Sequence, residues 1–196
     1  RTKGEGFFLA VLRKPEGEET QIRYKSTSSQ GKKKTGSSKV NAGASKEQLL
    51  AARAWLLSAE DYEVSANGMN ITAFSKEYIS ELSVLQQSLR VVQAGVTLAE
   101  VKGKDLIPNH ALAMSTVQVS DAFPREEISY EQAIAYLRKE AIVLSGTAPR
   151  GYVLLTYKDV PLGFVKNIGN RANNLYPQEW RIRSGYLPDE ILMLLK

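Results

Sequence analysis

The sequence predicts an α+β fold, in which a mixed module of helices and strands is followed by a small β-barrel-like module. Short apolar runs typical of strands are interleaved with short amphipathic segments typical of helices. They do not alternate regularly, as strands and helices do in a doubly wound parallel sheet. The chain has 196 residues, 43% of them hydrophobic, which suffices for one large domain or two small ones.

The N-terminal part of the chain divides into a strand and a linker. Residues 6–13 are a continuous aromatic and aliphatic run, which predicts a buried strand that ends at Lys14 and Pro15. Residues 15–46 contain Lys32–Lys34 and many Ser, Thr and Gly residues, a composition typical of a flexible linker. The lysine run would also suit an electrostatic contact with RNA, but a solvated linker is the simpler interpretation.

Capping and turn signals define the next elements. Ser45 is followed three residues later by Gln48, the spacing of a capping box, which predicts the start of a helix. Asn67-Gly68 separates two alternating runs, at residues 62–66 and 69–74, and predicts a β-hairpin.

A second helix is predicted from Ser75, its N-cap, to Leu89. Short strands at residues 90–93 and 96–101 follow, and Asn109 is predicted to cap a short helix. The apolar stripe of the second helix consists of Ile79, Leu82, Leu85 and Leu89.

The last third of the chain predicts one helix and a group of strands. Ser129 and Gln132 again have capping-box spacing, at the start of an amphipathic helix over residues 129–140. A hairpin is predicted at Lys158-Asp159, and the apolar tail at residues 187–196 is predicted to pack on a neighbouring element. The predicted strands are residues 151–157, 161–166 and 180–183.

Side chains needed for catalysis or metal binding are scarce. The chain has no cysteine, which excludes disulfides, a cysteine nucleophile and cysteine-ligated zinc. The single histidine, His110, excludes a multi-histidine metal site and has no evident partner base. Glycine-rich nucleotide-binding loops and a Gly-x-Ser-x-Gly elbow are absent as well. The sequence therefore predicts no catalytic residue and no metal site.

The positive charge lies toward the two ends of the chain. The net charge is +5; residues 1–46 hold eleven basic and four acidic residues, and residues 151–196 hold six and four. Basic segments favour polyanions, although a solvated surface is an equally good interpretation of charge alone. No run approaches the roughly 20 apolar residues that span a bilayer and no signal peptide is evident, so no membrane partner is expected. The missing initiator Met suggests a fragment or a processed chain.

The stretch from Tyr157 to Arg183 has the composition of a nucleic-acid surface, with five basic and two acidic residues. Lys and Arg suit phosphates, Asn amides suit sugar or base edges, and Tyr157, Tyr176 and Trp180 offer rings for stacking. Gly163 and Gly169 would allow close backbone approach. Burial in the small core is the favoured interpretation for Phe164 and Trp180, and turn formation is the alternative for the amides.

The predicted RNA-binding residues come from this stretch and from one earlier loop. Lys102 and Lys104 flank Gly103 and form the second, weaker basic loop. The members within the main stretch are Lys158, Lys166, Asn167, Arg171, Asn173, Asn174, Tyr176, Arg181 and Arg183.

Four pieces in this order resemble one known family: residues 4–10 (GEGFFLA), 101–113 (VKGKDLIPNHALA), 133–140 (AIAYLRKE) and 157–183. Together they are similar to the C-terminal half of RsmF-type 16S rRNA (cytosine-C5) methyltransferases of the Sun family. The resemblance covers nearly the whole chain except the linker, and the ordered combination is more specific than any single piece.

The resemblance implies a division of the chain. Residues 1–14 would be the last strand of a missing catalytic domain, and residues 15–46 a flexible linker. Residues 47–140 would be a middle α+β module, and residues 141–196 a PUA-like RNA-binding domain. Family members use a cysteine nucleophile and a glycine-rich S-adenosylmethionine site, and this chain has neither.

The resemblance therefore implies a cytoplasmic RNA-binding region with no cofactor of its own, in a protein that uses S-adenosylmethionine as a whole. Its expected partners are rRNA of the small ribosomal subunit and its own catalytic domain upstream. The alternative is a protein-interaction or structural module that packs on a catalytic domain without touching RNA.

Overall fold

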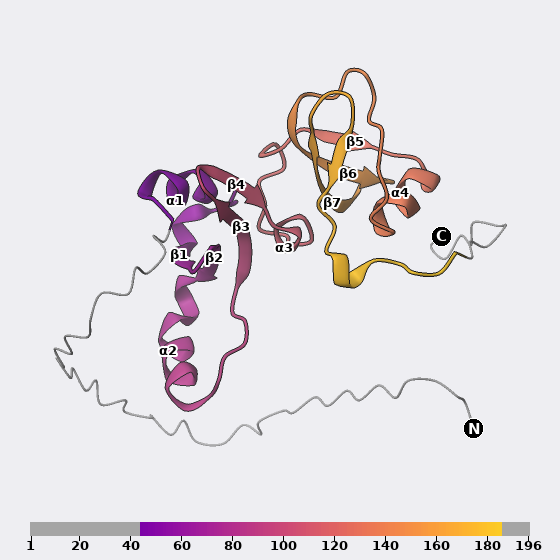
Figure 1. Ribbon diagram of the computed structural model, residues 1–196. Helices are drawn as coiled ribbons and strands as arrows, with labels where there is room; N and C mark the ends of the chain where they lie inside the picture. Colours follow the sequence, from indigo (N-terminus) through magenta and orange to yellow (C-terminus); the bar gives the residue numbers. More distant parts are fainter. Residues whose placement is uncertain (1–43, 186–196) are drawn as a thin grey trace, which may run out of the picture. The chain divides into compact units, whose positions relative to one another are not determined.

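The computed structural model describes residues 44–185 of the chain (Figure 1). The predicted strand at residues 6–13, nearly all of the predicted linker and the apolar tail at residues 187–196 lie outside this range. The described part contains two four-stranded sheets, each accompanied by short helices. The α+β class predicted from the sequence is therefore confirmed.

The first sheet is antiparallel, in the order β1-β2-β3-β4. The predicted hairpin is present, but Asn67 pairs with Asn70, so the turn residues are Gly68 and Met69. Gly68 takes a φ of +61°, a conformation that only glycine adopts at no steric cost. The strands are β1 (Tyr62–Asn67), β2 (Asn70–Ser75), β3 (Val96–Lys102) and β4 (Asp105–Pro108).

Helix α1 (Lys46–Arg53) covers the apolar face of this sheet. It begins at the predicted capping box, in which the Gln48 N–H donates to Ser45 Oγ and the Ser45 N–H donates to Gln48 Oε1. Ala52 is fully buried in a core cluster that it shares with Ile71 and Leu98. Local capping fixes where the helix starts, and apolar burial fixes which side of the sheet it covers.

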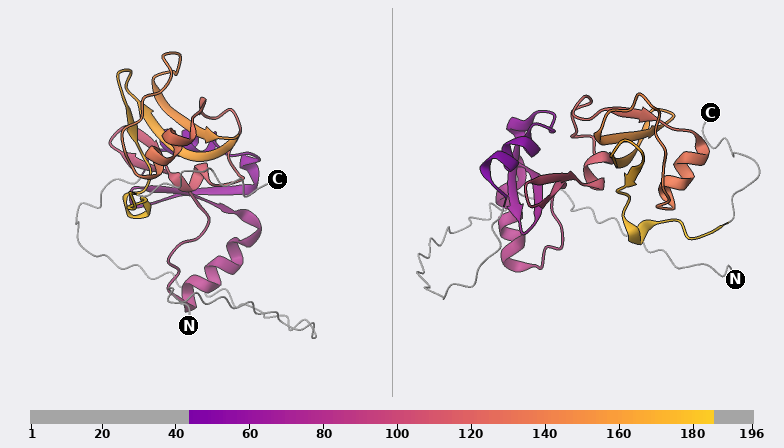
Figure 2. Two further views of the ribbon diagram at one scale, coloured as in Figure 1. Left: turned by 90° about the vertical axis from the view of Figure 1, so that its right-hand side faces the viewer. Right: turned by 45° about the horizontal axis from the view of Figure 1, so that its top comes forward.

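Helix α2 (Ile79–Ser88) extends away from the strands (Figures 1 and 2). It follows a 3₁₀ turn at Lys76–Tyr78, and the side chain of Ser75 makes no capping bond. None of its residues is buried. The strand predicted at residues 90–93 is wrong, because this segment returns the chain from α2 to the sheet and has no neighbouring strand.

The second sheet has the order β5-β6-β7-β8, with β5 parallel to β6 and the other pairs antiparallel. Before it, Asn109 caps α3 (His110–Ala113) as predicted, accepting the Ala111 N–H at 2.9 Å. The capping box of Ser129 and Gln132 is also confirmed, at the start of α4 (Tyr130–Leu137). The strands are β5 (Arg125–Glu127), β6 (Gly151–Tyr157), β7 (Val160–Asn167) and β8 (Ala172–Asn174).

Both faces of the second sheet are covered. Leu154 and Phe164 belong to the core shared with α1, α3 and the first sheet, whereas Val153 and Val165 belong to a second core with Tyr136 of α4. Phe164 is 1% exposed, so its predicted burial is confirmed.

Two expectations for this region are corrected. The predicted barrel is not closed within residues 44–185, because β5 and β8 are the edges of the sheet and do not pair with each other. The predicted strand at residues 180–183 is absent: Trp180 ends the 3₁₀ turn η3 (Gln178–Trp180), and the Ile182 N–H donates to the Leu137 carbonyl at the end of α4. Trp180 is 59% exposed rather than buried, because this segment crosses the end of α4 instead of joining a sheet.

Candidate nucleic-acid interface

Two basic segments that are far apart in the sequence meet in the structure. The Lys166 ammonium on β7 lies 3.3 Å from the Asp105 carboxylate, and Asp105 pairs with Lys102 across β3 and β4. Lys102 and Lys104 are exposed at the β3–β4 turn, and α1 fixes this turn because the Gln48 side chain donates to the Gly103 carbonyl. We call Lys102, Lys104 and Lys166 the lysine cluster.

The Lys166–Asp105 pair is a contact that a polyanion can replace. The side chains of Lys166 and Asp105 are 40% and 64% exposed, and solvated pairs of this kind contribute roughly 0–1 kcal/mol. The hydrogen bond to Asp105 raises the pKa of the Lys166 ammonium, so the group is cationic at neutral pH. The same ammonium lies 5.3 Å from the centre of the Tyr152 ring, which holds it over the sheet.

A second basic group surrounds the β7–β8 turn. Arg171 and Asn173 are exposed there, and Gly169 has a φ of +105°. A Cβ added to Gly169 would come within 2.9 Å of the Arg150 guanidinium, so glycine lets that group lie against the turn backbone. Sequence reasoning missed Arg150. Its position could have indicated its role, because Arg150 directly precedes β6 and the first residue of β6 pairs with Asn167 at this turn.

Arginine side chains also line a small cavity at the end of α4. Arg138, Arg181 and Arg183 share a cavity of about 310 Å³ with Glu140. Arg138 donates from its guanidinium to the Ser184 carbonyl, while its buried Nε has no hydrogen-bond partner among the described residues. We call Arg138, Arg181 and Arg183 the arginine notch. The sequence analysis predicts Arg181 and Arg183 as RNA-binding residues but not Arg138, because Arg138 follows directly on an amphipathic helix and gives no separate signal.

Two predicted amides are engaged within the protein. The Asn167 amide donates to the carbonyls of Ala148 and Pro149, and its oxygen accepts the Gly169 N–H. The Asn174 amide donates to carbonyls at the end of α4, and its oxygen accepts the Tyr176 N–H. These side chains therefore hold turns and strand ends in place.

Tyr176 packs among aromatic rings, and Lys158 is at the other end of a hairpin from Lys166. The ring of Tyr176 packs edge-on against Tyr136 and His110, with centroid distances of 5.4 and 5.1 Å. Lys158 lies in the β6–β7 turn, whereas Lys166 is near the other end of the same hairpin. RNA contact by either residue stays a prediction.

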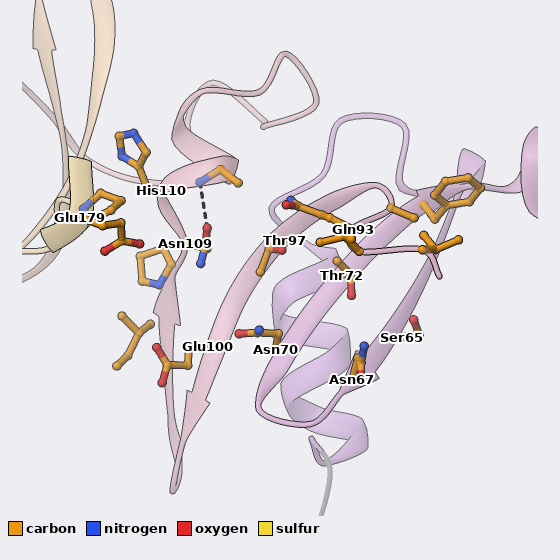
Figure 3. Close-up of a pocket in the computed structure, with 18 of the residues that line it drawn as sticks. Ser65, Asn67, Asn70, Thr72, Gln93, Thr97, Glu100, Asn109, His110 and Glu179 are labelled. Atoms are coloured by element: carbon orange, nitrogen blue, oxygen red, sulfur yellow. Dashed lines mark hydrogen bonds between the residues drawn. The ribbon is translucent and has the colours of Figure 1, made fainter. Parts of the chain in front are cut away.

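A polar groove lies over the open face of the first sheet, with a volume of about 790 Å³ (Figure 3). Two cross-strand rows form its floor. Thr72 pairs with Ser65 and Thr97, and Asn70 pairs with Asn67 and Glu100. A β-bulge between Ile71 and Thr72 keeps the polar side chains on this face and the apolar ones on the α1 face.

The walls of the groove come from α2 with the segment after it, and from α3 with η3. Gln93 lies on one side, and Asn109, His110 and Glu179 lie on the other (Figure 3). Burial lowers the pKa of the His110 imidazole, which is therefore neutral at pH 7, and its Nδ1 has no hydrogen-bond partner among the described residues. Trp180 lines the groove at a centroid distance of 5.4 Å from His110.

The described residues hold no group of three or more His, Cys, Asp or Glu side chains placed to bind a metal ion. None of the helices between residues 44 and 185 is long and apolar enough to span a bilayer.

The second half of the chain is similar to known proteins of one family. Residues 123–182 match the family model of the methyltransferase RsmF PUA domain. The chain is 30% identical over 99 residues to ribosomal RNA small subunit methyltransferase F of Klebsiella pneumoniae, which is 50% of this chain and 20% of that protein. It is 35% identical over 92 residues to the protein of the same name from Shewanella woodyi, which is 46% of this chain and 19% of the relative.

The matched region spans about a fifth of the length of these relatives. The family match begins before β5 and ends after η3, so it includes the whole second sheet and α4. The predicted resemblance is thereby confirmed for the C-terminal half of the chain, which is similar to RsmF-type ribosomal RNA methyltransferases and matches their PUA domain.

Proposed function

We propose that this chain is the RNA-binding region of an S-adenosylmethionine-dependent rRNA 5-methylcytosine methyltransferase. It holds rRNA of the small ribosomal subunit so that a catalytic domain elsewhere in the protein reaches its cytosine. The relatives are named as ribosomal RNA small subunit methyltransferases, and the family match is to their PUA domain. The cofactor and the chemical step belong to the catalytic domain.

The lysine cluster is the observation that carries this proposal. Lys166 of the second sheet pairs with Asp105 beside the turn that carries Lys102 and Lys104, and this carboxylate is itself exposed. Exposed lysines with weak partners attract phosphates by releasing counterions. The arginine notch and the pair of Arg150 and Arg171 extend the basic surface beyond this cluster.

We further propose that the RNA-binding module begins near residue 123 and not at residue 141. β5 and α4 precede residue 141, yet β5 pairs with β6 and α4 supplies Tyr136 to the core beneath β7. A module cut at residue 141 would lose an edge strand and one side of its core.

Filter binding of a small-subunit rRNA fragment at two salt concentrations tests the function. Lys102→Ala with Lys104→Ala should weaken binding and reduce the slope of log K against log salt by about 0.7–0.9 per lost contact. Arg171→Ala and Arg181→Ala should also weaken binding. Lys76→Ala is the matched control, because Lys76 follows β2 at the opposite end of the first sheet. Binding that is absent, or insensitive to salt, would overturn the proposal.

A protein-docking role is the second candidate, and α2 is the observation that favours it. Leu85 on α2 and Leu89 directly after it are 47% and 62% exposed, and no residue of this helix is buried. Such a stripe suits docking onto the catalytic domain. Light scattering of this chain with a separately produced catalytic domain should detect a complex that Leu85→Ser with Leu89→Ser abolishes.

A further inference from the structure

The polar groove over the first sheet is more enclosed than an ordinary solvated sheet face. The solvated face of an antiparallel sheet is normally polar and open to water. Here the face is walled on two sides, and its volume of about 790 Å³ is typical of a ligand site. Its floor consists mainly of hydroxyl and amide side chains, so the groove offers hydrogen bonds with little charge.

Charge in the groove argues against a phosphate inside it. Among the described residues that line it, the cation is Lys139, whose ammonium donates to the Tyr176 carbonyl. Glu100 and Glu179 add negative charge. This lining disfavours an anionic group and suits a group without negative charge that can both donate and accept hydrogen bonds.

Amides and an aromatic ring in one groove match the two recognition surfaces of a nucleobase. Asn and Gln side chains have a donor and an acceptor side by side, which suits the edges of bases. Asn67, Asn70 and Gln93 present such groups from three segments of the chain. Trp180 supplies a large exposed ring, and rings of this kind stack on unpaired bases.

The ring of Trp180 is held in place by its neighbours. It packs edge-on against the His110 ring, and the His110 ring packs edge-on against Tyr176. His110 reaches this position because Gly163 has no side chain: a Cβ there would come within 2.8 Å of Nδ1. The imidazole is neutral and adds no charge near the ring, and its Nδ1 is buried against Gly163.

The groove is also next to the lysine cluster. Glu100 lies on its floor, and Lys102 is two residues further along the same strand. A site for a base therefore lies beside a site for a phosphate, as the base and the phosphate are neighbours in a nucleotide.

We propose that the polar groove binds unpaired bases of RNA, with Trp180 as the stacking surface for one base and the Asn and Gln side chains along the groove as contacts to base edges. This inference rests on the proposed RNA-binding function and adds a preference for single-stranded over double-stranded RNA. Phosphates of the same strand lie on the lysine cluster.

The test compares a short unstructured RNA with a duplex of the same length, using the full chain. Trp180→Ala should weaken single-strand binding about 5- to 150-fold, the range for losing one stacked base, with little effect on the duplex. Trp180→Phe should retain most of the affinity, and Asn70→Ala should lower it several-fold. These changes should leave the salt slope unaltered, unlike Lys102→Ala. Circular dichroism should show that the exposed Trp180 position tolerates both substitutions.

Free cytidine and uridine provide a direct readout that does not depend on phosphates. Either nucleoside should quench tryptophan fluorescence in the wild type but not in Trp180→Phe, which retains only Trp55. Salt-dependent RNA binding that ignores Trp180→Ala would overturn the groove site and leave the proposed function standing. No RNA affinity in the wild type would overturn both. Quenching by short neutral peptides and not by nucleosides would overturn the groove as a base site.

Discussion

The two sheets of this protein have the same number of strands but differ in how their faces are covered. The second sheet is covered on both faces, and its strand β6 contains four consecutive buried residues, Val153–Thr156. The first sheet is covered on one face by α1, and its other face is the floor of the polar groove. The second sheet is therefore the rigid scaffold, and the first sheet offers a free face to a ligand.

The residue patterns of the central strands reflect this difference in burial between the two sheets. β6 reads GYVLLTY, an apolar run without alternation, as expected for a strand with both faces buried. β2 reads NITAFS, and its alternate residues Ile71 and Ala73 are buried while those between them face the groove. A continuous run therefore marks the scaffold, and strict alternation marks a sheet with one free face.

Replacing one Phe of each sheet by Ala should show the largest difference in stability between the two sheets. Phe164→Ala removes a ring that is 1% exposed and contacts Phe123 at a centroid distance of 4.7 Å, and we expect it to lower the free energy of unfolding by about 3–5 kcal/mol. Phe74→Ala removes a half-buried ring from the groove face and should cost about 1 kcal/mol. Urea denaturation measures both.

Phe164→Leu is the control for the larger effect, because it keeps most of the apolar volume and should cost under about 1.5 kcal/mol. Equal losses for Phe164→Ala and Phe74→Ala would contradict the difference in cover between the two sheets.

Local signals predicted the elements well, and long-range contacts account for most of the errors. The capping boxes of Ser45 and Ser129 and the hairpin at Lys158-Asp159 depend on neighbours in sequence, and all three are present. The pattern Trp180-Arg-Ile-Arg183 alternates like a strand, yet it joins neither sheet of the described residues and crosses the end of α4.

The candidate site was harder to predict, because residue type does not reveal how a side chain is used. The amides of Asn167 and Asn174 could bind base edges, but they donate their hydrogen bonds to backbone carbonyls of their own chain. Arg138 and Arg150 join the basic surface only through residues distant in sequence. The meeting of Lys166 with Asp105 likewise depends on how the two sheets pack.

Glycine substitutions give a second, smaller contrast between the sheets. A Cβ at Gly163 of β7 would lie 2.2 Å from Tyr136 Oη, at a φ of +142°, so Gly163→Ala should destabilise the protein by about 2–3 kcal/mol. Gly103, in the β3–β4 turn, has a φ of +63° but open space around it, and its substitution by Ala should cost about 1 kcal/mol. Thermal unfolding measures both changes.

The Tyr136 hydroxyl provides the control for the Gly163 effect. In a Tyr136→Phe background the closest clash is gone, so Gly163→Ala should cost less than it does in the wild type. An unchanged cost would mean that backbone strain and the approach of His110, and not the Tyr136 hydroxyl, make glycine necessary.

The smallest expected effect is a pH dependence at the exposed edge of the second sheet. The Thr156 hydroxyl donates to the Glu127 carboxylate, and this bond, together with backbone N–H groups of the β6–β7 turn, lowers the pKa of Glu127 below its ordinary value of 4.5. Because the folded state favours the ionised form, the contribution of Glu127 is fully present above pH 4.5 and is lost as the pH falls through the lowered pKa. Melting temperatures measured between neutral pH and pH 3 should therefore fall less steeply for Glu127→Gln than for the wild type. Thr156→Val removes the main donor without changing the charge and should flatten the same acid limb, so a wild-type pH profile in both variants would show that this bond does not secure β5 to β6.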